Sequence, residues 1–352
     1  MGKRYFSDKI VEWYLNNRRP LPWRETTNPY HIWLSEVILQ QTRVSQGLPY
    51  YQQFVESFPS VIDLAHASEQ EVLRLWQGLG YYTRARNLHK CAKEIAELNG
   101  GLFPTTARQL EALPGIGDYT AAAIASFAFG EVAAVLDGNV YRILSRIFGI
   151  DTPINSPEGK RVFSSLAAEL ISKENPALHN QGVMEFGATF CTPVNPKCAE
   201  CPFKDSCVAL HRGLINHLPV KIRAKKSRKR YFFYLVIKKG DSLLMRKRQA
   251  KDIWNGLFDF LLIEKNKPVK AEKLISDAEH RKWMENARRI EVSKSYKHVL
   301  THQTIHCRFI NIQAEESFTT TSEDMAFYTR TEIARLPKPA LITRFLQEQN
   351  GD

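Results

Sequence analysis

The sequence contains no hydrophobic run long enough to cross a membrane, no internal repeat and no low-complexity tract. Its longest apolar stretch, from Ala121 to Phe129, is far shorter than the roughly 20 residues that a transmembrane helix requires. The N-terminal residues M-G-K-R-Y-F-S-D-K-I also lack the apolar region of a secretory signal. These absences argue against a membrane or secreted protein, and we expect an intracellular, cytoplasmic one.

Cysteine is scarce and unevenly distributed. Two of the 6 cysteines, Cys91 and Cys307, stand alone and are expected to be core thiols. The other four follow the spacing C-x6-C-x2-C-x5-C, which is too crowded for a secreted disulfide framework. They are Cys191, Cys198, Cys201 and Cys207. Four such thiolates can hold a metal centre. Zinc and an iron–sulfur cluster are the candidates, and zinc sites usually contain two close pairs, whereas only one occurs here.

Acidic residues are outnumbered by basic ones. The sequence has 37 Asp and Glu against 49 Lys and Arg, which gives a formal net charge of +12. This balance favours a polyanionic partner, although a generally basic surface would also explain it. The segment Lys221–Arg230, K-I-R-A-K-K-S-R-K-R, contains no acidic residue at all. We expect a linker there that is either solvated or lies along DNA phosphates.

A length of 352 residues predicts two domains. Up to about residue 215 the hydrophobic spacing is helical and strand-like alternation is scarce. Helices are expected from a cap at Ser7, from Pro29, and over residues 69–76, 83–98, 118–129, 138–148, 157–173 and 176–190. This half is therefore predicted to be all-α.

The pattern changes beyond Tyr231. The runs Y-F-F-Y-L-V-I and S-L-L-M, joined by K-K-G-D, predict a β-hairpin. Further strands are expected over 258–263 and 304–312, with helical stretches near 271–287 and 340–348. The expected architecture is a mainly α N-terminal region over 1–220, a basic linker over 221–230 and an α+β domain over 231–352.

The segment L-P-G-I-G-D, Leu113 to Asp118, predicts a tight turn between two helices. Gly115 and Gly117 permit backbone conformations closed to other residues and let a phosphate approach closely. An ordinary helix–turn–helix corner would explain a lone G-x-G. Because the chain is basic and Pro114 fixes the turn entry, we favour a helix-hairpin-helix that binds DNA phosphate.

These motifs, followed by V-L-D-G-N-V-Y-R and the four-cysteine run, resemble the endonuclease III superfamily of DNA glycosylases. The stretches S-E-V-I-L-Q-Q-T-R-V, L-P-W-R and G-L-G-Y-Y are similar to those of its A/G-specific adenine glycosylases. The resemblance implies a six-helix-barrel module, a helical module with a [4Fe–4S] cluster on the four cysteines, and a C-terminal Nudix-like domain. It also implies a monomeric base excision repair enzyme that removes adenine mispaired with 8-oxoguanine or guanine in double-stranded DNA.

Breaking an N-glycosidic bond requires protonation of a poor leaving group and stabilisation of a cationic sugar. Glu36 lies among apolar residues of a predicted helix, where burial would favour a protonated carboxyl, although most helical glutamates are exposed. The resemblance makes Glu36 the acid and the activator of water, Asp137 the stabilising anion and Asn139 an orienting residue. As a helix cap, Asp137 would need no further role. Tyr119 occupies the position where lyase-competent relatives carry a lysine, and a phenol cannot form an imine, which predicts a monofunctional glycosylase.

Substrate contacts also follow from the resemblance. Gln181 is expected to contact the flipped adenine, and Tyr81 and Gln41 are expected to contact the lesion base pair. Arg24 belongs to the L-P-W-R motif and is included among the substrate contacts. Leu300, Thr301 and His302 fall on an F-S-H triplet that senses 8-oxoguanine, with Leu replacing the aromatic residue. The C-terminal domain lacks the acidic R-E-x-x-E-E box of Nudix hydrolases, so phosphohydrolase activity is not expected.

Two other functions fit the sequence less well. An endonuclease III-like glycosylase/lyase for oxidised pyrimidines conflicts with Tyr119 and the extra domain. A catalytically silent iron–sulfur DNA-binding or redox regulator would need neither Glu36 nor Asp137. The sequence therefore favours the adenine glycosylase.

Overall fold

The computed structural model describes residues 2–222, 227–249, 252–278, 280–284, 287–320 and 324–349. The chain divides into two units: unit 1 is Met1–His66 with Asn87–Ala224, and unit 2 is Ala67–Arg86 with Lys225–Asp352. The segment Ala67–Arg86 thus belongs to the same unit as the C-terminal half. The domain boundaries expected from the sequence, at 220 and 231, placed this segment in the N-terminal region.

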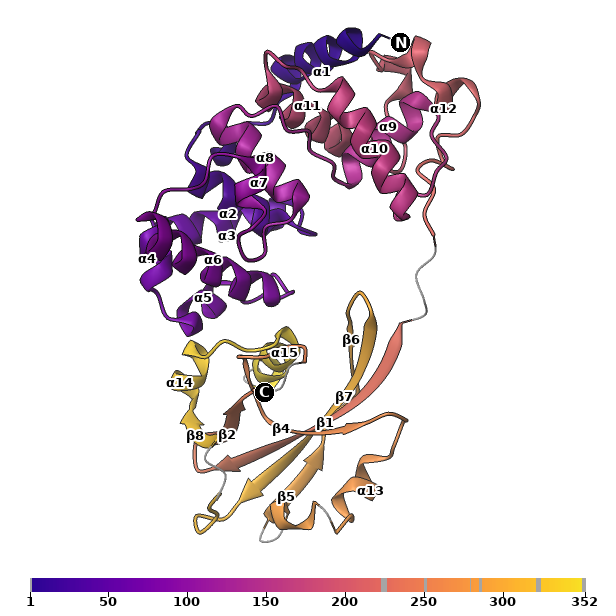
Figure 1. Ribbon diagram of the computed structural model, residues 1–352. Helices are drawn as coiled ribbons and strands as arrows, with labels where there is room; N and C mark the ends of the chain where they lie inside the picture. The colour runs from indigo at the N-terminus through magenta and orange to yellow at the C-terminus, as the bar shows by residue number, and fades with distance from the viewer. Residues whose placement is uncertain are drawn as a thin grey trace. The chain divides into compact units, whose positions relative to one another are not determined.

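Unit 1 is helical, as the sequence predicts (Figure 1). Its elements are α1 (Lys3–Asn17), η1 (Pro22–Arg24), α2 (Pro29–Leu39), α3 (Val44–Ser57), α4 (Val61–His66), α7 (Ala107–Leu110), α8 (Asp118–Phe129), α9 (Gly138–Phe148), α10 (Pro157–Leu170), α11 (Pro176–Thr189), η2 (Cys198–Glu200), η3 (Lys204–Ser206) and α12 (Val208–His211). Helix α6 (Thr83–Asn99) begins in unit 2 and continues into unit 1. The predicted cap at Ser7 is wrong: α1 starts at Lys3, and Ser7 Oγ lies 3.0 Å from His179 Nδ1 on α11.

One apolar core of unit 1 joins the first helix to the cysteine-containing loop. Phe6 and Ile10 of α1 pack with Phe163 of α10 and Phe186 of α11, and Phe203 lies in the same cluster. Figure 1 shows α1 and α11 side by side, with α9 adjacent to α11. Because the loop after Thr189 contributes Phe203 to this core, packing against the core fixes the loop that carries the four clustered cysteines.

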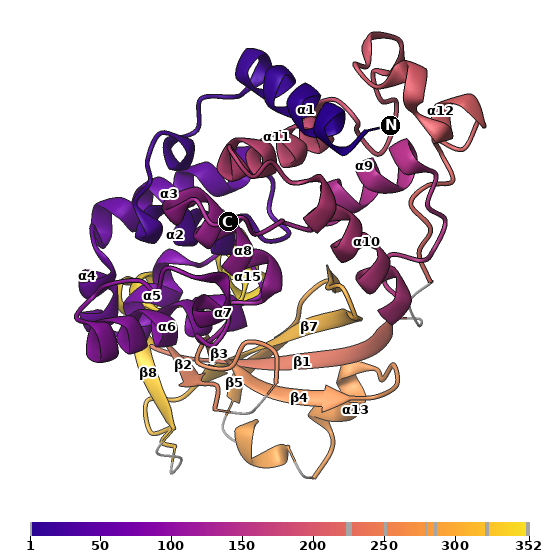
Figure 2. The ribbon, with the colours of Figure 1, turned by 45° about the horizontal axis from the view of Figure 1, so that its top comes forward.

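Unit 2 contains α5 (Glu69–Leu75) and a mixed sheet with strand order β3-β2-β1-β7-β5; β4, β6 and β8 pair with β1, β7 and β2. The strands are β1 (Arg228–Lys239), β2 (Ser242–Lys247), β3 (Phe258–Asp259), β4 (Leu261–Lys265), β5 (Ala287–Val292), β6 (Tyr296–Val299), β7 (Gln303–Ala314) and β8 (Met325–Thr329). The predicted β1–β2 hairpin is confirmed. The parallel β1 and β7 run side by side in Figure 2.

Helices cover both faces of the sheet. On one face Phe233 and Leu235 of β1 form a core with Leu274 of α13 (Ala271–Ile275). On the other, Phe345 of α15 (Ala340–Gln349) stacks on Phe309 with ring centroids 3.8 Å apart. Because β1 is covered on both sides, it shows the near-continuous hydrophobicity of a buried strand.

Two predictions for this region are wrong. The helix expected over 271–287 is limited to α13 and the 3-10 turn η4 (Arg281–Trp283), because A-R-R-I-E-V alternates as a strand and pairs with β7 as β5. The linker expected up to Arg230 ends earlier, since β1 begins at Arg228. Arg230 is buried and donates to Asp252 at 2.6 Å and Glu264 at 2.7 Å. Residues 223–226 of the predicted linker lie outside the described residues.

A short helix, α14 (Arg330–Arg335), follows β8. In the part of the chain that is described, no helix combines the length and the apolar character that a membrane span requires.

Candidate active site and DNA-contacting elements

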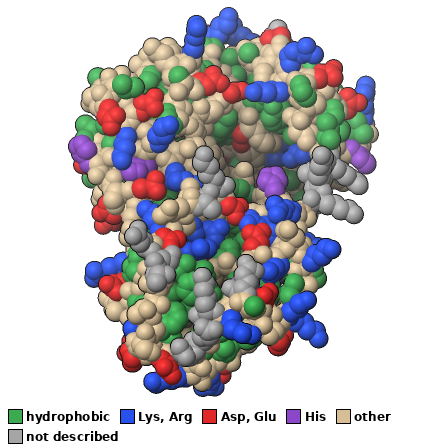
Figure 3. Space-filling view, turned by 60° about the horizontal axis from the view of Figure 1, so that its bottom comes forward, with side chains coloured by type: hydrophobic (Ala, Val, Ile, Leu, Met, Phe, Trp, Pro, Cys, Tyr) green, Lys and Arg blue, Asp and Glu red, His purple; other side chains and the backbone are tan. Residues whose placement is uncertain are grey.

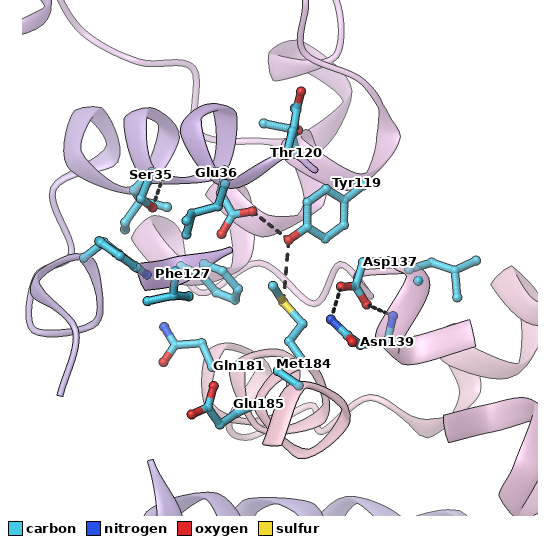
Figure 4. Close-up of a pocket in the computed structure, with 18 of the residues that line it drawn as sticks. Ser35, Glu36, Tyr119, Thr120, Phe127, Asp137, Asn139, Gln181, Met184 and Glu185 are labelled. Atoms are coloured by element: carbon cyan, nitrogen blue, oxygen red, sulfur yellow. Dashed lines mark hydrogen bonds between the residues drawn. The ribbon is translucent and has the colours of Figure 1, made fainter. Parts of the chain in front are cut away.

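Helices α2, α8, α9 and α11 of unit 1 surround a cavity of about 1080 Å³. Glu36, Tyr119, Asp137, Asn139 and Gln181 all line it, and the sequence placed each of these residues in the site. Figure 4 shows Glu36, Tyr119 and Asp137 around the same space, with Gln181 and Glu185 projecting from α11. The structure therefore brings together residues as far apart in sequence as Glu36 and Gln181.

Glu36 lies in α2 and is only 7% exposed, so its carboxyl is largely desolvated. Burial raises the pKa of Glu36 from its ordinary 4.5 to about 7; the Tyr119 hydrogen bond opposes the rise, and the nearby Asp137 charge adds to it. The Tyr119 hydroxyl donates to Glu36 Oε2 at 2.6 Å (Figure 4). Glu36 can therefore hold a proton near neutral pH, which a general acid requires.

Asp137 caps the N-terminus of α9. Its Oδ1 accepts from the backbone N–H of Asn139 at 2.9 Å and of Val140 at 2.8 Å, while Oδ2 accepts from the Asn139 side-chain amide at 2.7 Å. Burial raises the pKa of Asp137, and these hydrogen bonds oppose the rise. Asp137 thus both caps the helix and lines the cavity, and Asn139 holds its carboxylate in a fixed orientation.

Arg142 connects this carboxylate to the cysteine loop, and sequence reasoning missed it. Its Nη2 donates to Asn139 Oδ1 at 2.8 Å and to the Gly187 carbonyl at 2.7 Å, and its Nε donates to the Cys191 carbonyl at 2.8 Å. Gly187 is required here because a Cβ would lie 2.5 Å from Asn139 Cβ. Arg142 ends the motif V-L-D-G-N-V-Y-R, about one turn after Asn139, and this place was the available signal, since an arginine in a helix is ordinarily exposed.

Gln181 and Arg24 have partners that define their orientation. The Tyr14 hydroxyl donates to Gln181 Oε1 at 2.6 Å, which leaves the Gln181 amide nitrogen to donate. Arg24 Nη2 donates to Glu185 Oε2 at 2.7 Å, and Arg19 Nε to Glu185 Oε1 at 2.5 Å. Glu185 and Arg19 were not predicted; both line the cavity, and Glu185 is buried between the two guanidinium groups.

The turn expected to bind phosphate lies between α7 and α8. Gly115 has φ +77°, and a Cβ there would lie 2.6 Å from Asn87 Cβ, so only glycine fits. Gly117 precedes α8 with open space around its Cα. Gln41, between α2 and α3, has φ 58° and is exposed at the rim of the cavity. A left-handed non-glycine residue is strained by about 1 kcal/mol or more, which is typical of functional positions.

The four cysteines are free thiols; Cys201 directly follows η2 and Cys207 directly follows η3. Burial raises the pKa of Cys201, the Phe203 backbone hydrogen bond opposes the rise, and the charges of Cys191, Cys207 and Cys198 add to it, which together bring the pKa to about 12. Arg146, 2% exposed, lies 3.5 Å from Cys191 Sγ and donates to the Thr192 carbonyl at 2.8 Å. The four thiols thus interact electrostatically with one another, and the Cys191 sulfur lies beside a fixed positive charge. The isolated Cys91 and Cys307 are buried, as predicted.

The remaining predicted contacts lie in unit 2. Leu300, Thr301 and His302 form the turn between β6 and β7, where Thr301 and His302 are exposed. Tyr81 is 47% exposed and therefore not a core residue, and its hydroxyl contacts Thr301 Oγ1.

The surface charge is mixed on the face drawn in Figure 3, where Lys and Arg side chains are spread over the surface with Asp and Glu between them. The positive charge of this face is therefore spread among negative charges.

Three family descriptions match the chain. They are the HhH-GPD superfamily base excision DNA repair protein over residues 34–167, the iron-sulfur binding domain of endonuclease III over 191–207, and the NUDIX domain over 233–348. Together with the cavity and the cysteine loop, they define a base excision DNA glycosylase of the helix-hairpin-helix class that carries an iron–sulfur cluster.

Curated relatives narrow the class. The adenine DNA glycosylase of Buchnera aphidicola subsp. Schizaphis graminum is 34% identical over 343 residues, which cover 95% of this chain and 96% of that protein. That of Mus musculus is 42% identical over 226 residues, covering 61% and 44%. The chain belongs to the adenine DNA glycosylase family.

Solved structures agree on the fold of the helical region. A thermostable thymine-DNA glycosylase is 29% identical, covers 60% of this chain and 97% of its own, and superposes with a TM-score of 0.56. Endonuclease III in a non-covalent DNA complex, at 22% identity and a TM-score of 0.52, shows the fold alone.

The cofactor of residues 191–207 is a [4Fe–4S] cluster, as the sequence predicts. The donor set fits it, because four neighbouring free thiols supply one cysteine for each iron. Among the described residues, no three or more His, Cys, Asp or Glu side chains are gathered for a single metal ion. Cys191, Cys198, Cys201 and Cys207 would hold the cluster, with Arg146 beside it.

Proposed function

We propose that this glycosylase hydrolyses the N-glycosidic bond of adenine mispaired with 8-oxoguanine or guanine, and that it acts as a monofunctional monomer. The observation that carries the proposal is the buried Glu36 carboxyl, whose pKa is about 7, next to Tyr119 and across the cavity from Asp137. The name of the curated relatives, adenine DNA glycosylase, supports adenine as the base removed.

The chemistry follows from the two carboxyl groups. Protonated Glu36 donates its proton to the adenine ring, so that the base leaves as a neutral species. The Asp137 carboxylate, oriented by Asn139 and the α9 amides, stabilises the positive charge that develops on the sugar. Glu36, now ionised, accepts a proton from the water that attacks the anomeric carbon, which restores the acid.

The identity of the partner base must be read elsewhere, because adenine itself is present in every normal A:T pair. Extruding a base costs a few kcal/mol, and least where pairing is already abnormal. Thr301 and His302 are exposed at the β6–β7 turn and offer hydrogen-bond groups for this purpose. Leu300 supplies an apolar contact in place of an aromatic ring. The exposed Tyr81 and Gln41, both with positive φ, are suited to contacting the disturbed pair.

Incubation of the protein with an A:8-oxoguanine duplex, followed by hot alkali, tests the proposal. We expect strand breakage at the adenine only after alkali, because Tyr119 cannot open the abasic site. Breakage without alkali would contradict the monofunctional mechanism, and an intact strand after alkali would contradict adenine excision. Glu36→Gln should lose roughly 10²–10⁴-fold in rate while mismatch binding survives.

A further inference from the structure

The turn that carries Tyr81, residues 78–82, has an unusual backbone. Gly78, Gly80 and Tyr81 all have positive φ, at 108°, 74° and 50°. A tyrosine in this region persists only where its surroundings hold it. The Trp76 indole N–H donates to the Gly80 carbonyl at 2.9 Å, and the Arg84 guanidinium lies 5.0 Å from the Trp76 ring and 5.7 Å from the Tyr81 ring. The turn is therefore supported from within.

Unit 2 also holds the turn at both ends through one residue, Lys338. Gln77, which precedes the turn, accepts from the Lys338 backbone N–H at 3.0 Å. Tyr82, which ends it, donates its hydroxyl to the Lys338 carbonyl at 3.2 Å. Gln77 Nε2 additionally donates to Thr343 Oγ1 at 3.2 Å. Both polar groups of the Lys338 backbone are thus bonded to the side chains that flank Gly78–Tyr81.

The segment around Lys338 is a rigid support. It reads P-K-P, and each proline fixes its own φ. The Pro337 carbonyl accepts from the Phe258 N–H of β3 at 2.8 Å, which ties the segment to the sheet. The Lys338 side chain is 4% exposed and donates to the carbonyls of Ile333 and Leu336, the latter at 2.6 Å. An ammonium turned inward in this way caps backbone groups and leaves little freedom to the segment.

We propose that Gln77 and Tyr82 are positioning residues through which the Nudix-like domain sets the geometry of Tyr81, and with it the preference for 8-oxoguanine over guanine opposite adenine. The inference rests on the proposed function of Tyr81 at the lesion pair. A purely structural role for the two side chains would affect folding and leave the preference between duplexes unchanged. The positioning role affects the preference because a displaced Tyr81 contacts the pair differently.

The test measures single-turnover excision rates of the full-length, cluster-loaded protein on A:8-oxoguanine and A:G duplexes at fixed salt. Gln77→Leu removes the hydrogen bonds to Lys338 and Thr343, and Tyr82→Phe removes only the hydroxyl. Gln53→Leu, at an exposed glutamine of α3, is the matched control. We expect Gln77→Leu to lower the ratio of the two rates about three- to tenfold, Tyr82→Phe by less, and Gln53→Leu not at all.

A second measurement asks whether the effect passes through Tyr81. In a Tyr81→Ala background, Gln77→Leu should cause no further fall in the ratio, because the residue that it positions is gone. An unchanged ratio in Gln77→Leu and Tyr82→Phe, or an equal fall with and without Tyr81, would overturn the inference. Were Gln77→Leu to misfold, Tyr82→Phe and Thr343→Val would decide. Failure of the wild type to excise adenine opposite 8-oxoguanine would instead count against the proposed function.

Discussion

Replacing Glu36 by Gln should make the protein more stable at neutral and alkaline pH while it lowers the excision rate by orders of magnitude. The group's pKa is raised by burial from 4.5 to about 7 in the folded state. Both states are protonated below pH 4.5, whereas between 4.5 and 7 the unfolded chain loses the proton and the folded chain keeps it. The wild type therefore loses stability as pH rises through this window, and a glutamine, which cannot ionise, does not.

The magnitude follows from the same two values. The rise from 4.5 to about 7, at about 1.4 kcal/mol per pH unit, amounts to about 3 kcal/mol. The advantage of Glu36→Gln over wild type should grow by about this amount between pH 4.5 and 7 and stay constant above. This is a large fraction of the free energy of unfolding of an ordinary domain, and it represents the stability given up to keep a buried carboxyl protonated.

Urea denaturation at several pH values, followed by far-UV circular dichroism, measures the effect, because the helices of unit 1 dominate that signal. The exposed Glu97→Gln in α6 is the matched control and should show no such pH-dependent gain. A stability difference between Glu36→Gln and wild type that does not change with pH would refute the reasoning.

Three further predictions follow from the hydrogen bonds of the site. Tyr119→Phe removes the donor that lowers the pKa of Glu36, so the alkaline fall of the single-turnover rate should move about one pH unit upward; a downward move would contradict the geometry. Arg142→Leu leaves Asn139 and the Cys191 carbonyl without this partner and should lower both the excision rate, about tenfold or more, and the iron retained after purification; full iron content and rate would contradict it. Thr301→Ala with His302→Ala should reduce the ratio of rates on A:8-oxoguanine and A:G duplexes, with excision from A:G little changed; an unchanged ratio would place the reading with Tyr81 and Gln41.

The helices of unit 1 could be predicted because their signals are local, whereas the roles given to the site residues came from the family resemblance. Glu36 lies in W-L-S-E-V-I-L, whose apolar neighbours indicate burial, and Asp137 stands where a helix cap is expected. The partners that fix these groups are distant in sequence. Glu185 meets Arg24 and Arg19 across more than 160 residues, and no periodicity within α11 reports such a pair.

The unit boundary could not be predicted for the same reason. Gln77 and Tyr82 lie between two predicted helices of the N-terminal half, yet their partners around Lys338 are more than 250 residues away. Strands β5, β6 and β8 were missed because each is only four to six residues long, so that a period of two is hard to recognise in the sequence.

Two buried glutamates in one cavity show why partners, and not residue type, assign the acid. Burial would raise the pKa of Glu185, but hydrogen bonds from Arg19 and Arg24 outweigh it and bring the value to about 2. Glu36 receives one hydrogen bond from a phenol and faces the like charge of Asp137, and its pKa is about 7. A carboxylate that stays ionised at every working pH cannot donate a proton to a leaving base, so Glu185 orients the two arginines. The proton must then come from Glu36, the one of these two carboxyl groups that still holds it at neutral pH.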